Sequence, residues 1–324
     1  MLNFTGNKIK IVKNLSVKIY QKNDYNDWNA FIGQAKNATF LFHRDFMEYH
    51  SDRFQDYSLI VLDGEKWVAV LPANVVGNQV FSHQGLTYGG LVYLGKTGAA
   101  LVEIILDVIL IFLKENKIQN LFLKLIPDFY QLRSSNEIHY FLFQKKADLV
   151  KRSMNLVVDY SKPLQISKSK LKHFRRVSEL GITIEETEDC TSFWNEILMP
   201  RLQEKHQVNP VHSLEEINLL KSRFPQNIKQ INAYYEGEIV AGITLFCSNQ
   251  VVKSQYGATS SKGESVRALD YLFINLIEKY ASENSFFDMG IVDDNASYNK
   301  GLLKQKEELG CAVYVQDVYK ITVV

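Results

Sequence analysis

The chain has 324 residues, of which 46% are hydrophobic and 23% are charged, a balance typical of globular proteins and not of disordered chains. Its 37 Lys and Arg residues and 36 Asp and Glu residues leave a net charge of +1, which argues against nucleic-acid binding driven by the overall charge. The length predicts two domains.

Cysteines and apolar stretches exclude further classes of protein. Cys190, Cys247 and Cys311 are too scattered for a disulfide framework or a zinc cluster, so we expect no metal site. The N-terminus lacks the apolar run of a signal peptide. The longest apolar stretch, 99–113, contains two acidic residues and is shorter than the ~20 residues of a membrane span. We therefore expect a cytoplasmic protein without membrane insertion.

Hydrophobic periodicity and turn residues predict helices and strands throughout the chain. In the first half these are a helix at 23–35, a hairpin at 57–76, a helix at 99–115, a strand at 121–125, a short helix at 134–144 and a strand at 148–160. In the second half they are a basic helix at 167–180, helices from 190–205 and from Ser213, a hairpin at 231–248, a helix at 267–279, and strands at 286–289 and 312–324.

The two halves repeat one another weakly. Each has a hairpin with an acidic residue and Gly at its turn, Asp63-Gly64 and Glu236-Gly237, followed by the tripeptide Asn-Gln-Val at Asn78 and Asn249. A Gly-rich loop, a long helix and a short strand follow in both halves. The pattern predicts an α+β fold, a mixed sheet flanked by helices, in two tandem domains at 1–162 and 163–324.

The segment 255–272 is the most informative local feature. A strand ends near Ala258, small residues follow, and a helix is expected to start near Ser265. Backbone N–H groups at a helix N-terminus favour a phosphate. The loop is neither a Walker loop nor GxGxxG, and a plain strand-to-helix turn remains the alternative. The residues expected to bind a phosphate-containing cofactor are Ser260, Ser261, Lys262, Gly263 and Arg267.

The order of a hairpin, a third strand, this loop, a helix and a fourth strand resembles the core of the GNAT superfamily. The resemblance is to the duplicated, Fem-like form of this superfamily, and it covers roughly residues 20–320. The motifs are KHFRRVSELGITI at 172–184, FWNEILMPRLQEKH at 193–206, RALDYLF at 267–273 and FDMGIVDDNASYNKGLLKQKEELG at 287–310. The usual GNAT pyrophosphate motif, Q/RxxGxG/A, is not matched at 260–265, which leaves the ligand of this loop open.

The resemblance implies an N-acyltransferase. Among such enzymes the sequence is most similar to bacterial proteins that acylate nucleotide-linked amino sugars for surface polysaccharides. The implied donor is a coenzyme A thioester, for example 3-hydroxybutanoyl-CoA, and the implied acceptor is a dTDP-linked 3-amino-3,6-dideoxyhexose. A neutral amine would attack the thioester directly, with no metal and no covalent enzyme intermediate. We expect a monomer whose partners are these small molecules and not nucleic acid.

Three residues are candidates for catalysis. His83 lies in the Gly-rich loop of the first repeat and is a candidate base; a hydrogen-bonded structural histidine is the alternative. Tyr256 and Gln255 share the strand expected to face the thioester, and alternation allows only one of them to point there. Tyr298 follows the last core strand, where a GNAT tyrosine often protonates the leaving thiolate; loop anchoring is the alternative.

Other residues are candidates for substrate contacts, each with a structural alternative. They are Arg44 (or Arg53) for an acceptor phosphate, Tyr88 for stacking on a base or sugar, His206, Asn209 and His212 beside the acceptor, and Asp293 in the last loop. The alternatives are a surface salt bridge, ordinary packing and loop capping. We expect the donor in the second repeat, because the first loop has no cation matching Lys262 or Arg267 apart from Lys96.

Two other functions remain open. An aminoacyl-tRNA-dependent ligase of a cell-wall precursor would use the basic helix at 168–176, but no heptad run predicts the coiled-coil arm of such relatives. A solvated connector helix explains the same charges. A catalytically silent double-GNAT module that binds a partner is the third reading.

Overall fold

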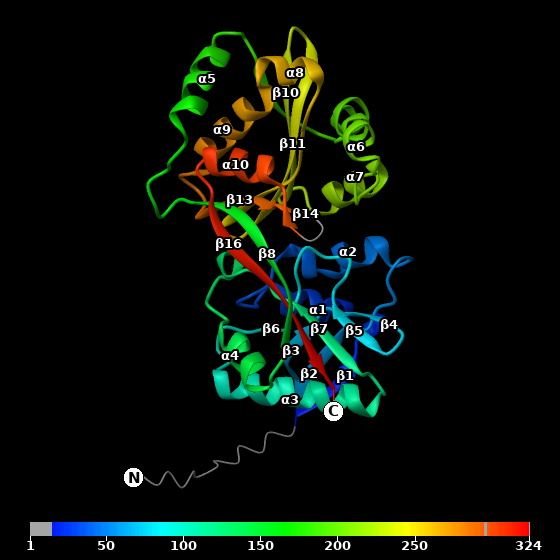
Figure 1. Ribbon diagram of the computed structural model, residues 1–324. Coiled ribbons are helices and arrows are strands. Elements are labelled where there is room, and N and C mark those ends of the chain that lie inside the picture. Colours follow the sequence, from blue (N-terminus) through cyan, green and yellow to red (C-terminus); the bar gives the residue numbers. More distant parts are fainter. Residues whose placement is uncertain (1–14, 295–296, 324) are drawn as a thin grey trace, which may run out of the picture.

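The structure, a computed structural model, describes residues 15–294 and 297–323. Two lobes lie one above the other and are joined by two long strands, β8 (Asp148–Asp159) and β16 (Ala312–Thr322) (Figure 1). No helix in the described part of the chain is long and apolar enough to cross a membrane.

In the described residues, the first lobe has four α-helices and strands from two sheets, one of which continues into the second lobe. Its strands are β1 (Leu15–Ile19), β2 (Leu59–Asp63), β3 (Lys66–Leu71), β4 (Asn74–Val76), β5 (Gln79–Ser82), β6 (Val92–Tyr93) and β7 (Asn120–Lys124). Its helices are α1 (Tyr25–Ile32), α2 (Arg44–Met47), α3 (Ala99–Glu115) and α4 (Glu137–Gln144). Strands β1, β2, β3 and β6 form a four-stranded sheet in that order. The apolar stripe of α3 packs into the core of this lobe through side chains such as Ile105 and Ile109.

The second lobe follows the same plan. Its strands are β9 (Thr183–Thr187), β10 (Ile228–Tyr235), β11 (Glu238–Ser248), β12 (Val251–Thr259), β13 (Phe286–Ile291), β14 (Asp293–Asp294) and β15 (Ser297–Tyr298). Its helices are α5 (Lys168–Ser178), a π-helix (Phe193–Leu198), α6 (Met199–His206), α7 (Leu214–Arg223), α8 (Ser261–Val266), α9 (Ala268–Tyr280) and α10 (Lys300–Glu308). Helices α5, α9 and α10 lie on one side of the sheet and α6 and α7 on the other (Figure 1).

One ten-stranded sheet runs through both lobes, in the order β4-β5-β7-β16-β8-β13-β12-β11-β10-β9. Strand β16 pairs with β8 along most of its length, and its last five residues, Val318 to Thr322, also pair with β7 of the first lobe. The C-terminal strand therefore crosses the boundary that the sequence suggested at 162/163.

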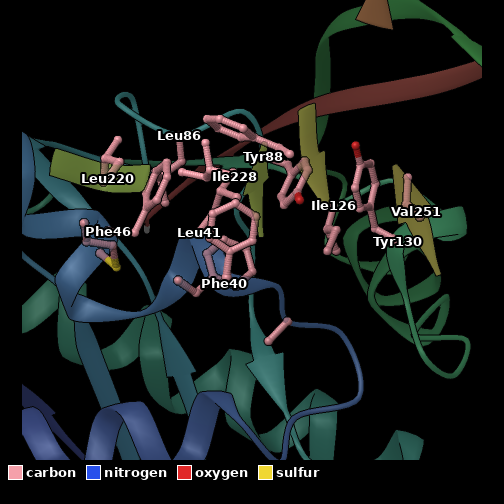
Figure 2. Close-up of a cluster of buried hydrophobic side chains, with 14 of the residues drawn as sticks. Phe40, Leu41, Phe46, Leu86, Tyr88, Ile126, Tyr130, Leu220, Ile228 and Val251 are labelled. Carbon is pink, nitrogen blue, oxygen red and sulfur yellow. The ribbon is translucent and has the colours of Figure 1, made fainter. Parts of the chain in front are cut away.

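Buried side chains from both lobes meet in one apolar core between them (Figure 2). Phe40 and Phe46 of the first lobe pack edge to face on Phe246 of β11. Tyr130, also from the first lobe, donates its hydroxyl proton to the buried carboxylate of Asp288 on β13. Because the two lobes share a core and a sheet, their relative position is fixed by burial and hydrogen bonding.

Two predicted elements differ from the structure. The helix expected to start near Ser265 begins at Ser261 and is interrupted at Arg267, whose φ of 58° is left-handed. The helix at 190–205 begins with the π-helical turn at Phe193–Leu198. Buried Phe193 and Trp194 lie in this turn, and their packing against the sheet overrides the regular helical spacing.

Candidate functional site

Strands β12 and β13 start as a parallel pair and then separate. Val251, Val252 and Lys253 pair with Phe286, Phe287 and Asp288, and the pairing ends there. Beyond this point β12 stays paired with β11 and β13 stays paired with β8, but the two no longer pair with each other, so a gap opens in the sheet. In this gap the edge of β12 has no neighbouring strand among the described residues, and its backbone groups are left for another partner.

A β-bulge lies on β12 where the strands separate. Ser254 pairs with Leu245 and Tyr256 with Thr244, which leaves Gln255 as the extra residue. The Gln255 side chain lines the gap, and its Oε1 is buried without a hydrogen-bond partner among the described residues. The Tyr256 ring packs on Trp194 and His212, and its hydroxyl lies near the Gln255 side chain; Tyr256 is not among the residues that line the gap. Gln255, and not the predicted Tyr256, therefore faces the gap.

An outer cavity of about 690 Å³ lies at the C-terminal end of β12. Its walls come from α6, the end of β12, α8, the start of α9 and α10; they include Leu198, Leu202, Gly257, Thr259, Leu269 and Leu302. Helix α9 has 13 residues and begins at this cavity, and no side chain caps its N-terminus at Arg267. The first backbone N–H groups of a helix carry partial positive charge, so this end favours an anionic ligand.

Three cations line the outer cavity. Arg201 and Lys205 of α6 both bond Glu264 of α8, so their charges are partly balanced. Arg267 is exposed at the junction of α8 and α9, and the structure gives it no carboxylate partner among the described residues. Asp270, the second acid at this cavity, bonds Lys170 of α5 instead. The local charge is therefore positive, centred on Arg267.

An inner cavity of about 390 Å³ adjoins the outer one, and the two share Gly257, Leu269, Leu302 and Gln305. The inner cavity fills the gap between β12 and β13. The lining is apolar at Phe273 and Met289, and Lys253 and Lys306 lie at its base. We call the two cavities together the groove.

The residues predicted to bind a cofactor divide into two groups. Gly263 and Arg267 line the outer cavity. Ser260 caps α8 by accepting from the Gly263 N–H, at 3.1 Å, and exposed Ser261 follows it outside the lining. Lys262 bonds Glu236 and Glu238 at the β10–β11 turn, away from the cavity. A side chain at Gly263 would overlap the carbonyl oxygen of Val240, so glycine lets α8 pack directly on β11.

The predicted substrate residue His212 lies beside Tyr256. The Tyr256 hydroxyl accepts from the His212 backbone N–H at 3.2 Å and lies 2.6 Å from His212 Nδ1. The tautomer of His212 sets which of the two groups donates in the contact with Nδ1. Burial, with His50 and Arg53 nearby, lowers the pKa of His212 to about 4, and burial raises that of Tyr256 to about 12. Both groups are therefore neutral at pH 7.

A row of rings leads from His212 to the predicted base His83. His212 stacks on Tyr49 at 5.2 Å, Tyr49 contacts His50 at 4.2 Å, and His50 stacks on His83 at 5.5 Å. His83 Nδ1 accepts from the Gly85 N–H, and burial lowers the pKa of His83 to about 3. His50 Nε2 faces the Gly85 carbonyl, and its Nδ1 is buried without a partner among the described residues. Sequence reasoning gave His50 no role, because the row exists only in three dimensions.

A third cavity, of about 460 Å³, lies in the first lobe beside this row and is lined by His50, His83 and Arg44. Arg44 is 2% exposed, bonds Glu48 and Asp56, and lies 3.8 Å from the centre of the Tyr20 ring. The charge of this buried guanidinium is therefore balanced by two partly exposed carboxylates. Arg53, the other candidate for an acceptor phosphate, bonds Glu216 and so forms the surface salt bridge that was the alternative.

The remaining candidates lie apart from the groove. Tyr88 is buried against Phe42 and Tyr130, which leaves no open face for stacking. Asn209 accepts from Gln203 on the surface, Asp293 bonds Lys151 and the Met154 N–H, and Tyr298 is 40% exposed. His206 ends α6, and its side chain lies outside what the structure describes. The described residues contain no group of three or more His, Cys, Asp or Glu placed to hold a metal ion.

The corresponding gap in the first lobe is closed. Strand β5 pairs with β7 in parallel, as β12 does with β13. The chain then returns so that Gly89 bridges to Leu125 and donates its N–H to Lys124 O at 2.7 Å. The Gly-rich loop fills the place that the groove occupies in the second lobe. In the described part of the chain the two lobes therefore differ at this place: the second has an open groove and the first does not.

Comparison with known proteins establishes the fold. No protein-family model matches the chain, and neither does any curated protein. Among solved structures, FemX is similar with a TM-score of 0.69 and 12% identity, over 95% of this chain and 97% of that one. L-PGS from Bacillus licheniformis gives a TM-score of 0.61 and 14% identity, over 93% of each chain.

A tandem GNAT protein from the clavulanic acid biosynthesis pathway gives a TM-score of 0.53 and 9% identity, over 96% of this chain and 99% of that one. At such identities the similarity shows the fold alone. The chain has a mixed α+β fold of two tandem GNAT-like units, which confirms the fold class predicted from the sequence. The comparisons do not identify the acceptor, and the nucleotide-linked amino sugar stays a prediction.

Proposed function

We propose that this protein is an N-acyltransferase that carries an acyl group from a donor in the groove to an amine. The observation that carries the proposal is the separation of β12 and β13 over a groove that starts at the uncapped N-terminus of α9. The outer cavity suits a phosphate group, and the inner cavity suits a buried reacting centre.

Coenzyme A thioester is the donor that we propose. Its pyrophosphate would lie at the start of α9, with Arg267 and the nearby Arg201 and Lys205 as counter-charges. The pantetheine arm would run along the free edge of β12 and hydrogen bond to its backbone. This path places the thioester at the Gln255 bulge, where the two cavities meet.

The chemistry at the bulge is direct transfer. The nitrogen of the neutral amine attacks the thioester carbonyl, the C–N bond forms, and the C–S bond then breaks. The amine loses one proton, and the leaving thiolate takes one up. The free backbone N–H groups of β12 are placed to stabilise the oxyanion. Holding donor and acceptor together accounts for much of the remaining rate increase.

Neither predicted histidine is placed as an open general base. His83 and His212 are neutral and buried; His83 Nδ1 already accepts from the Gly85 N–H, and His212 Nδ1 is hydrogen bonded to the Tyr256 hydroxyl. A sugar amine with a pKa near the ~8 of an α-amino group is partly neutral at physiological pH. We therefore propose that the enzyme binds the neutral amine and needs no strong base.

For the acceptor, we propose a nucleotide-linked amino sugar, as the sequence resemblance implies. It would reach the thioester from the face of β12 that carries Tyr256 and His212, opposite α9 and α10. The third cavity, with its ion pairs and imidazoles, adjoins the same ring row and offers many hydrogen-bonding groups to a polar acceptor.

Aminoacyl-tRNA is a second candidate donor. The similarity to FemX covers the whole chain, and the sequence resembles Fem-like proteins. Helix α5 also packs on α9 through the Lys170–Asp270 bond. Its exposed cations Lys172, Arg175 and Arg176 therefore border the outer cavity and could contact a nucleic acid backbone.

Titration calorimetry with CoA and acetyl-CoA tests the proposal. We expect micromolar binding to the wild type and a loss of about tenfold or more in Arg267→Gly, which removes a charge-assisted contact. Glycine suits the left-handed φ at this position, so weaker binding would not reflect backbone strain. Lys279→Ala, at the far end of α9, is the control.

Absence of heat with both compounds would contradict the CoA donor. Transfer from aminoacyl-tRNA to an amine acceptor would then support the second candidate. Absence of both activities would leave the catalytically silent module.

A further inference from the structure

The inner cavity is larger than an acetyl group needs. An acetyl group occupies little more space than two or three water molecules of roughly 30 Å³ each. The cavity volume is about 390 Å³, and its walls at Leu269, Phe273 and Met289 are apolar. A longer acyl chain would cover these walls. The base of the cavity, however, is not apolar.

Two lysines with little exposure line this cavity, and only one of them is paired with a carboxylate among the described residues. Lys253 Nζ is 3.2 Å from Asp288 Oδ2, and the Lys253 side chain is only 12% exposed. Asp288 is 1% exposed and also accepts from the Tyr130 hydroxyl and the Gly290 N–H. Lys306, which is 5% exposed, has no carboxylate within salt-bridge distance among the described residues. The cluster therefore has one positive charge in excess.

Lys306 retains a donor for a ligand. Its ammonium donates to the carbonyl oxygens of Gly290 and Ile291, at 3.0 and 3.1 Å. An ammonium has three N–H donors, so one remains at the cavity that Lys306 lines. Burial and the charge of Lys253 lower the pKa of Lys306 to about 8, and Asp288 opposes the shift. Lys306 is thus mostly protonated at pH 7, and a buried cation without a counter-ion is costly.

A purely structural role does not account for the third donor and the excess charge of Lys306. Tying α10 to β13 uses two donors and leaves the third and the excess charge unexplained. The other ionisable group facing Lys306 is the Cys311 thiol, and burial raises its pKa to about 12, so it stays neutral. An anionic group of a ligand in the cavity would balance the charge and accept the third hydrogen bond.

We propose that the inner cavity selects an acyl group whose far end carries a carboxylate, bound by Lys306 with Lys253 beside it. The acyl donor is then the monothioester of a short dicarboxylic acid. This inference rests on the proposed function, because it assumes that a CoA thioester occupies the groove. It differs from the hydroxyacyl donor that the sequence resemblance implied.

Two non-hydrolysable thioethers test the proposal on the full chain. S-(3-carboxypropyl)-CoA and S-butyl-CoA have arms of the same length and differ in one carboxylate. By calorimetry we expect the carboxylate compound to bind at least about tenfold tighter, as for a hydrogen bond to a charged group. In Lys306→Met this preference should disappear, while S-butyl-CoA still binds. Lys304→Met, on the same helix with a 75% exposed side chain, should keep the preference.

Each of the other possible results of these titrations rules out either this inference or the proposed function. Equal binding of the two thioethers by the wild type would overturn this inference and leave the proposed function standing. Tighter binding of S-(3-hydroxybutyl)-CoA than of the carboxylate compound would overturn it in favour of a hydroxyacyl donor. Failure of all CoA compounds, including free CoA, would overturn the proposed function itself. The wild-type comparison decides even if Lys306→Met does not fold.

Discussion

Gly89 lies so close to the carbonyl group of Ser82 that a side chain at Gly89 would overlap it. The Ser82 hydroxyl also accepts from the backbone N–H groups of Gly90 and Lys124, both at 3.1 Å. These contacts hold the Gly-rich loop across the end of β5, where the second unit has its groove. The difference between the two units therefore depends on a glycine that allows close approach of two backbone segments.

Gly89→Ala should destabilise the protein by about 2–3 kcal/mol, because the new methyl group meets backbone atoms that cannot rotate away. Urea unfolding measures the change. Gly95→Ala is the control, since an added Cβ there makes only ordinary contact with the Arg133 side chain. Equal stability of the two variants would show that the loop is not held as described.

Gly263→Ala should weaken CoA binding, because a Cβ there overlaps the Val240 carbonyl oxygen and forces α8 away from β11. Helix α8 forms one wall of the outer cavity, so we expect a loss of about tenfold, together with lower thermal stability. Ser261→Ala lies on the same short helix with an exposed side chain and should bind CoA like the wild type. Calorimetry and a melting curve on both variants make the comparison.

Lys262→Ala should leave CoA affinity within about twofold of the wild type. Its ammonium bonds Glu236 and Glu238 at the hairpin turn, and exposed ion pairs contribute little. The sequence alone favoured Lys262 as a phosphate ligand, so this variant separates the two interpretations. A tenfold loss in Lys262→Ala would support the interpretation from the sequence and contradict the placement in the structure.

Arg44→Met should lower the free energy of unfolding by about 2–3 kcal/mol, because it leaves Glu48 and Asp56 without their buried partner. This value is discounted because both carboxylates are about one third exposed, at 38% and 35%. Arg53→Met, which breaks the more exposed pair with Glu216, should cost less than about 1 kcal/mol. Denaturant unfolding of both variants would reveal the difference.

Stability should fall on mild acidification. Burial lowers the pKa of His83 to about 3 and of His212 to about 4, against about 6.5 in the unfolded chain. Above pH 6.5 the two histidines are neutral in both the folded and the unfolded state, so they do not lower the free energy of unfolding. Between about pH 6.5 and 4 the unfolded state takes up protons that the folded state does not, so each histidine reduces stability by about 1 kcal/mol per pH unit.

Urea unfolding between pH 7.5 and 5, in steps of about half a unit, measures this slope. His212→Phe should make it shallower, because one of the buried imidazoles is gone. His139→Gln, outside the ring row, should leave it unchanged. A slope that stays the same in His212→Phe would contradict the assignment to these buried rings.

Elements with local hydrogen bonding could be predicted from the sequence. The predicted turn at Glu236-Gly237 is present, with the positive φ that glycine adopts freely, and Ser213 and Glu216 form the predicted capping box. These features depend on residues one to four positions apart, so nearby residue types suffice. The order of such elements was enough to predict two tandem units and their fold class.

The site depended on contacts between distant segments. Alternation along β12 allowed either Gln255 or Tyr256 to face the gap, and the bulge opposite Thr244 and Leu245 decided for Gln255. The sequence could not show that Lys253 and Lys306 line one cavity, because they come from a strand and a helix more than fifty residues apart.

What the sequence determined by itself, then, was the set of elements and their order, since short-range periodicity and capping encode them. Only the tertiary structure decided that one gap is filled by Gly89 and the other is open. It also decided that β16 crosses between the lobes, and that Nδ1 of His83 and Nδ1 of His212 are already hydrogen bonded. Pairing register and burial set these features, and both depend on long-range contacts.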